Sequence, residues 1–225
     1  MRALFVALRV VVAAAILAAV VGQLLVSLDF WRSSGVTGIV SNVVNFFSFF
    51  TVDANVASAV VLLIGAGLGV AGRSVDPGWF AVTRASVTTY MVVTGIVYNL
   101  LLRGIELPQG STLGWSNEIM HVVVPIYLLV DWILAPGRRP VRWRAIWIVV
   151  IFPFVWSVYT LVRGPLVIDQ VYGTDFWYPY PFMNPNVQPN GYASVAVYML
   201  LITAVIALAG LGAIAASRTK RAISS

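Results

Sequence analysis

Apolar residues fill six long segments of this chain, and shorter stretches rich in polar residues, glycine or proline separate them. A helix needs about 20 mainly apolar residues to cross the hydrocarbon core of a bilayer. The pattern therefore predicts an all-α integral membrane protein with a single domain over residues 1–225. The predicted transmembrane helices cover about residues 4–28, 41–71, 79–102, 117–134, 143–162 and 192–216.

The first two segments are unusually long. Nineteen residues from Val10 to Leu28 carry no charge, whereas a cleaved signal peptide has an apolar core of about 7–15 residues, so we expect a retained helix. As one helix, segment 41–71 would be roughly 46 Å long, against about 30 Å of hydrocarbon. It must tilt, bend or project into the headgroups. Gly65 and Gly69, near its end, would let a neighbouring helix approach closely.

Composition agrees with a lipid environment and excludes several kinds of chemistry. The chain is 60% hydrophobic and 10% charged, whereas soluble domains carry about 25% charged residues. It has no cysteine, which excludes disulfides and thiolate nucleophiles. His121 is the single histidine, which argues against a histidine-based metal centre or haem. We therefore predict no metal and no cofactor.

Basic residues gather at alternate ends of the apolar segments. One side has Arg2, Arg9, Arg73, Arg84, Arg138, Arg139, Arg142, Arg144, Arg218, Lys220 and Arg221, and the other has Arg32, Arg103, Arg163 and the acids Asp29, Glu106, Glu118, Asp169 and Asp175. The positive-inside rule then places both termini in the cytoplasm. This distribution predicts contact with the bilayer and no binding of nucleic acid. Richness in Ala, Val, Gly and Arg suggests a bacterial plasma membrane.

The segment "NFFSFFTVDANVASAV", residues 45–60, keeps polar side chains in an apolar setting. On one continuous helix, Ser48, Thr51, Asn55 and Ser58 share a face, and Asp53 lies on the opposite one. A polar stripe in lipid must face protein or trapped water. We expect it to line an internal pocket, with bonding between helices as the alternative. Asp53 is open to either a structural or a functional interpretation, protonated or paired with an arginine such as Arg84 or Arg103.

The fourth segment contains "WSNEIMHVVVPIYLLVDW", with His121 about one turn inside its non-cytoplasmic end. Pro125 removes the backbone hydrogen bond to the His121 carbonyl and should bend the helix there. Asn117 and Glu118 precede the histidine by four and three residues, so either could orient its ring. A histidine bonded within a helix interface is the simpler alternative. We also expect Asp131 to form a structural ion pair with Arg138 or Arg142.

Topology brings the two polar sites to one half of the membrane. Thr51 lies about 13 Å, and His121 about 6 Å, below the outer starts of their helices. A tilted or bent pair of helices could match these depths. A hydroxyl beside an imidazole in a dry pocket is the minimum apparatus for nucleophilic acyl transfer.

At these residues the chain resembles a known family, the androgen-induced-gene (FAR-17a type) membrane proteins. The motif "FFTVDANV" matches the family's catalytic threonine at Thr51, "NEIMHVVVP" its catalytic histidine at His121, and "WYPYPF" an element around Tyr180. Eukaryotic members are intramembrane threonine hydrolases that cleave fatty acid esters of hydroxy fatty acids. Glu118 stands where those members carry a histidine. The resemblance implies a bacterial member.

The resemblance implies a mechanism in which His121 removes the proton of Thr51 and an acyl-threonine forms on a membrane lipid or fatty acid ester. Asn45, Asn55 and Asn99 are candidate donors to the oxyanion. The loop Trp177–Phe182 could cap the pocket or simply anchor at the interface.

Two other functions compete with the hydrolase. The first is a transporter or ion pathway built on Asp53, Glu118, His121 and Asp131. Against it, these acids lie at different depths, and no inverted repeat is evident. The second is a lipid-binding or assembly protein without chemistry.

Overall fold

A computed structural model of the chain describes residues 1–105 and 110–219. Glu106, Lys220 and Arg221, which the charge distribution above includes, lie outside them. Within the described residues, six helical stretches are long and apolar enough to cross a membrane. The predicted fold class, an all-α membrane protein, is confirmed.

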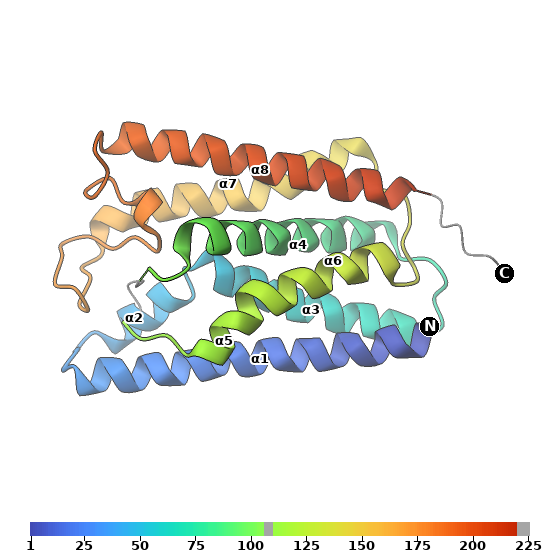
Figure 1. The fold of residues 1–225 in the computed structure, drawn as a ribbon, viewed down its shortest axis with the longest axis horizontal. Helices are drawn as coiled ribbons and strands as arrows, with labels where there is room; N and C mark the ends of the chain where they lie inside the picture. The colour runs from blue at the N-terminus through green and yellow to red at the C-terminus, as the bar shows by residue number, and fades with distance from the viewer. Residues whose placement is uncertain (106–109, 220–225) are drawn as a thin grey trace.

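Some of these stretches consist of more than one helical element, and Figure 1 labels the α-helices. In chain order, the elements are α1 (Arg2–Ser33); α2 (Ile39–Phe46) and α3 (Phe50–Val70); α4 (Gly78–Val97) and the π-helical turn η1 (Tyr98–Leu102); α5 (Gly114–Glu118), the π-helical turn η2 (Ile119–Val123) and α6 (Val124–Leu134); α7 (Ile146–Arg163), flanked by short 3₁₀ turns; and α8 (Tyr192–Arg218). A further 3₁₀ turn, η5 (Pro181–Met183), lies in the loop before α8.

The single helix predicted over residues 41–71 is in fact two helices. Helix α2 ends at Phe46, the chain turns through residues 47–49, and α3 begins at Phe50. Phe49 has an extended backbone, with φ −72° and ψ 127°. A break inside a membrane requires new partners for the backbone groups that it frees. The indole of Trp156 donates to the Ser48 carbonyl at 3.1 Å, so tertiary contacts stabilise the bend.

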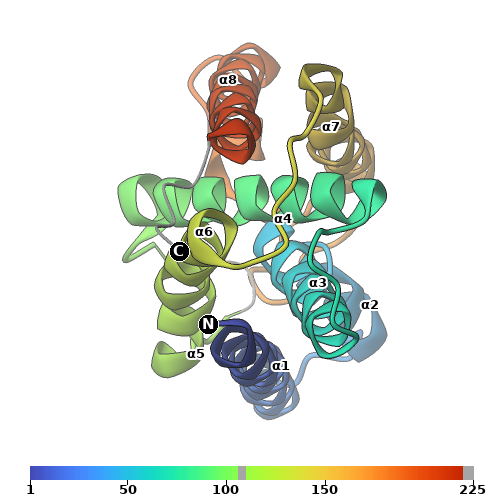
Figure 2. The ribbon, with the colours of Figure 1, turned by 90° about the vertical axis from the view of Figure 1, so that its right-hand side faces the viewer.

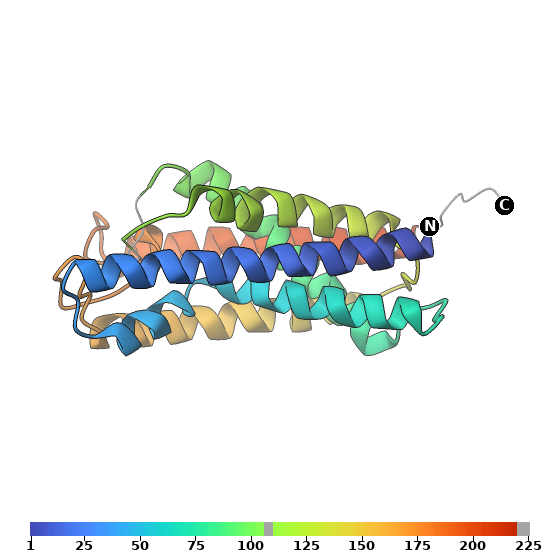
Figure 3. The same cartoon turned by 90° about the horizontal axis from the view of Figure 1, so that it is seen from below.

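Helix α4 lies at the centre of the bundle. It contacts α3 and α6 on one side and α7 and α8 on the other, as Figure 2 shows. It is the most buried of the six stretches, and α8 is the least. Helix α1 lies against α3 and the α5–α6 stretch, which the view in Figure 3 shows clearly.

The close approach of α1 and α3 uses the two glycines predicted for it. A Cβ added at Gly69 would lie 2.6 Å from Cγ2 of Val6, and one at Gly65 would lie 3.0 Å from the Arg9 guanidinium. A larger side chain at either position would therefore push α1 away. The small residues serve the helix contact that their spacing indicated.

Four charged side chains form a buried network between α1, α4 and α6. Asp131 lies 2.8 Å from both Arg9 and Arg84, and Arg84 also pairs with Asp76 at 2.9 Å. All four are at most 5% exposed. The prediction of an ion pair at Asp131 holds, but the expected partners Arg138 and Arg142 are wrong. The partners come instead from α1 and α4, because these helices pack against α6.

Both ends of the described chain lie at the same end of the bundle (Figure 1). Arg2 donates to the Gly72 carbonyl, and Arg138 donates to the Thr219 carbonyl, so the loops α3–α4 and α6–α7 lie there too. We call this the arginine-rich end. By the positive-inside rule we expect it to face the cytoplasm.

Candidate active site

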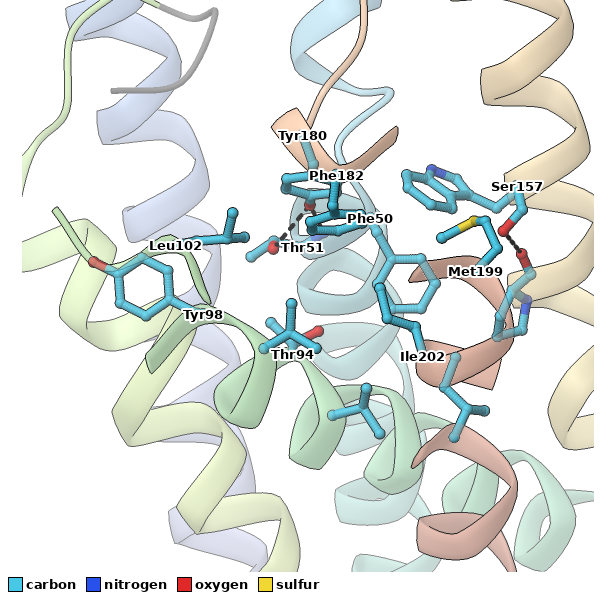
Figure 4. Close-up of a pocket in the computed structure, with 15 residues that line it drawn as sticks. Phe50, Thr51, Thr94, Tyr98, Leu102, Ser157, Tyr180, Phe182, Met199 and Ile202 are labelled. Carbon is cyan, nitrogen blue, oxygen red and sulfur yellow. Dashed lines mark hydrogen bonds between the residues drawn. The ribbon is translucent and has the colours of Figure 1, made fainter. Parts of the chain in front are cut away.

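Thr51 is the second residue of α3, directly after the break. The first N–H groups of a helix have no partner inside it. The N–H of Thr51 donates instead to the Tyr180 hydroxyl oxygen, at 3.2 Å. The side-chain Oγ1 of Thr51 lies 3.3 Å from the same oxygen, and Figure 4 shows both side chains at the pocket wall. The break therefore places a hydroxyl at the positive end of a helix dipole.

Tyr180 comes from the long loop before α8 and is buried among aromatic rings. It stacks on Phe182 with ring centroids 5.2 Å apart and meets the edge of Phe49 at 5.6 Å. Burial raises the pKa of Tyr180 to about 12, so the phenol stays protonated. Its oxygen accepts from the Thr51 N–H, and among the described residues Thr51 Oγ1 is the one acceptor for its proton. We therefore assign Tyr180 as the donor to Thr51 Oγ1.

The Thr51 side chain lines a narrow pocket with a free volume of about 60 Å³. Helix α4 and turn η1 supply Val93, Thr94, Val97, Tyr98 and Leu102, α7 supplies Pro153 and Trp156, and α8 supplies Met199, Ile202 and Ile206. Most of this wall is hydrocarbon. Its chemistry suits an acyl chain better than a polar ligand.

His121 lies in the π-helical turn η2 and is buried, with 7% exposure. Its Nδ1 is 2.9 Å from the Asn117 carbonyl oxygen. A carbonyl can only accept a hydrogen bond, so Nδ1 carries the proton, and Nε2 of the neutral ring keeps its lone pair. The ring stacks on Tyr98 with centroids 3.9 Å apart. Tyr98 also lines the Thr51 pocket, so one side chain contacts both the imidazole and the pocket.

Two π-helical turns, η1 and η2, meet beside the histidine. The Asn99 amide of η1 donates to the carbonyls of Gly95, at 2.7 Å, and His121, at 3.4 Å. It therefore supplies a donor to the carbonyl that Pro125 leaves without a helical partner. The Asn117 amide donates to the Tyr98 hydroxyl. Turns of this kind are frequent at functional sites because they re-aim side chains.

The structure places Thr51 and His121 on adjacent elements, α3 and η2. The Asn55 amide donates to the carbonyls of Thr51, at 2.9 Å, and Met120, at 3.3 Å. One side chain thus bridges the backbones that carry the two groups. Among the hydrogen bonds of the described residues, none joins Thr51 Oγ1 to the imidazole of His121.

The three amides predicted as oxyanion donors lie outside the Thr51 pocket. Asn45 accepts from Arg163 at 2.6 Å, and the amide groups of Asn55 and Asn99 donate to backbone carbonyls. The Thr51 hydroxyl bonds instead to that of Tyr180, a residue that the sequence indicated as a landmark of the resemblance and as a candidate for substrate binding or support.

The predicted polar stripe divides into several roles. Of its four members, only Thr51 lines the pocket. Ser48 lies inside the break, where its hydroxyl is 2.9 Å from that of Tyr159. Ser58 donates to the carbonyl one turn earlier, and Asn55 bonds between helices. The wheel failed for Ser48 because it assumed one continuous helix.

Two acidic residues lie away from the pocket. Glu118 forms an exposed ion pair with Arg103 at 2.8 Å, so its carboxylate is not the group that orients the histidine. Asp53 is half-buried on the other face of α3. Its expected partners, Arg84 and Arg103, pair with other acids.

Trp156 and Tyr98 are pocket residues that the sequence did not single out. Both belong to apolar helices rich in aromatic residues, where no spacing marks them.

Comparison with protein-family models, with curated proteins and with solved structures finds no match. The function of this chain must therefore be inferred from the geometry of the site.

Proposed function

We propose that this protein is an intramembrane lipid ester hydrolase with Thr51 as its nucleophile and His121 as its general base. One observation carries the proposal: the Thr51 hydroxyl lies at a helix N-terminus, faces an apolar pocket and is held by the Tyr180 phenol. A hydroxyl bound only for structural reasons would not need a lining that suits an acyl chain.

The surroundings of Thr51 favour negative charge on its oxygen. The N-terminal end of α3 carries the positive end of the helix dipole, which stabilises an anion there. The Tyr180 O–H is aimed at the same atom, and a donor in a dry site is worth more than one in water. With its oxygen accepting from Tyr180, Thr51 is free to give its own proton to a base.

His121 supplies that base in this proposal. Its Nδ1–H is fixed on the Asn117 carbonyl, so Nε2 is the atom that can accept a proton. The hydrogen bond from Thr51 to Nε2 forms when the ester enters the pocket. Catalytic contacts are often long before substrate binds and tighten in the complex.

The reaction then follows the two steps of acyl transfer. The Thr51 oxygen attacks the ester carbonyl carbon, the bond from that carbon to the alcohol oxygen breaks, and His121 returns the proton to the departing alcohol. Water next attacks the acyl-threonine, again with His121 as base, and releases the fatty acid. During each attack, the Tyr180 O–H, which is donated to Thr51 Oγ1 in the free site, turns to the developing oxyanion.

The apolar lining favours an ester with a long acyl chain. Fatty acid esters of hydroxy fatty acids are the substrate class that the family resemblance suggests. A transporter receives less support, because the buried charges Arg9, Arg84, Asp76 and Asp131 are fully paired with one another.

The test is covalent labelling of the purified protein with a fluorophosphonate probe, together with hydrolysis of p-nitrophenyl esters of increasing chain length. Thr51→Ala and His121→Ala should lose both signals, whereas Thr51→Ser should keep the labelling. Thr89→Ala is the matched control, since Thr89 is buried but its hydroxyl bonds only to the Ala85 carbonyl. Labelling that survives Thr51→Ala, or its absence from the wild type, would overturn the proposal.

A further inference from the structure

A second pocket lies at the arginine-rich end, between the first turn of α4 and the start of α7. Its free volume is about 550 Å³, much larger than that of the pocket beside Thr51. Gly78, Ala81 and Val82 of α4 form one wall, and Trp147 and Ile148 of α7 form the other. The loop between α6 and α7 closes its rim. We call it the α4–α7 groove.

Three arginines of that loop and the following turn line the groove: Arg139, Arg142 and Arg144. All three are exposed. Among the described residues, none of the three forms an ion pair or a side-chain hydrogen bond. The two described acids at this end, Asp76 and Asp131, already pair with Arg84 and Arg9. The rim therefore carries three positive charges that no acid of the described chain balances.

The walls below this rim are apolar and open to the surroundings. Trp147 is 73% exposed and Ile148 is 55% exposed. Trp79, on the first turn of α4, is 61% exposed. Exposed tryptophans at one level of a bundle indicate the membrane–water interface, where the ring sits among headgroups. The groove thus places a cationic rim above an apolar wall. At this depth a lipid has its headgroup above its acyl chains.

We propose that the α4–α7 groove binds an anionic phospholipid, with its phosphate between the three arginines and an acyl chain along Ala81, Val82 and Ile148. Guanidinium groups match phosphate oxygens in charge and geometry. A nucleic acid or an acidic protein would pair with the arginines of the rim but would leave the apolar wall uncovered. A neutral lipid would pack against the apolar wall but would leave the arginines without an anionic partner.

The test measures binding of phosphatidylglycerol with brominated acyl chains to the protein in neutral detergent, by quenching of tryptophan fluorescence. A basic residue near an anionic lipid surface contributes an attraction that corresponds to about fivefold in affinity. Arg139→Gln/Arg142→Gln/Arg144→Gln should therefore weaken binding about a hundredfold. Trp147→Phe should reduce the amplitude of the quenching, because it removes the tryptophan that lies in the groove wall.

The matched control removes the same charge from the same end of the bundle, in Arg2→Gln/Arg73→Gln/Arg218→Gln. These residues do not line the groove, so the loss of affinity should be at least tenfold smaller. Equal losses in the two variants would overturn the proposal, because they would mean general attraction to the surface. Equal quenching by brominated phosphatidylcholine would overturn it too. The groove arginines are exposed, so circular dichroism and the melting temperature should stay unchanged.

Discussion

The hydroxyl of Tyr180 is the group on which the proposed site depends most directly. Tyr180→Phe removes that one oxygen and keeps the ring, which stacks on Phe182 and packs against Phe49. It deletes two contacts, at 3.2 Å to the Thr51 N–H and at 3.3 Å to Thr51 Oγ1. The change is therefore local to the nucleophile.

Two magnitudes follow from these contacts. Removal of one donor to an oxyanion lowers kcat by about 10²–10³, and KM should change little because the ring and the pocket wall remain. The Thr51 N–H loses its buried acceptor, which costs about 1–3 kcal/mol of stability. For a chain of this length, that lowers the melting temperature by several degrees, at about 2–4 °C per kcal/mol.

The assay measures kcat and KM for a long-chain p-nitrophenyl ester, with the melting temperature of the same preparation. Tyr178→Phe is the matched control, because its hydroxyl bonds to Tyr192 and not to Thr51. It should keep kcat within about threefold, a change of less than 1 kcal/mol in the barrier. Wild-type kcat in Tyr180→Phe would refute the role of the phenol. So would a loss confined to KM.

Three further predictions concern stability. Asp131→Asn leaves two buried arginines with one acid between them, so it should destabilise the protein by about 3–5 kcal/mol, measured by unfolding in a denaturing detergent; wild-type stability would contradict the network. Gly69→Ala forces a Cβ to 2.6 Å from Val6, an overpacking cost of about 1–3 kcal/mol in the same assay, whereas Gly67→Ala, with open space around it, is the control. Burial raises the pKa of Tyr180 from 10.0 to about 12. The unfolded chain therefore ionises first, and stability should fall as pH rises from 10 to 12, with a smaller fall in Tyr180→Phe; equal falls would contradict this pKa.

Much of the fold could be predicted from the sequence because lipid leaves the chain few choices. Backbone groups in hydrocarbon must bond within the segment, so each long apolar run becomes a helix. Six such runs return the chain to the end where it began. Gly65 and Gly69 also predicted a close helix contact, since small residues at this spacing are typical of helix interfaces in membranes.

The candidate site could be predicted only in part. The sequence singled out Thr51 and His121 as candidates. It did not predict the arrangement of the groups around them. Asn45, Asn55 and Asn99 have the chemistry of oxyanion donors, yet none of them lines the Thr51 pocket. The packing of neighbouring helices decides which polar side chains reach the pocket. Residue spacing along the chain does not show this.

Long-range contacts decided what the sequence left open. The break before Thr51 is held by Trp156 and Tyr180, which lie more than 100 residues further along the chain. Asp131 pairs with Arg9, 122 residues away, although Arg138 is close in sequence. Hydrogen bonds inside a helix are local, so the sequence by itself determined the six spans. The backbone groups that a break frees, and charges that are buried, need partners from other helices. Only the packing of those helices could therefore form the site.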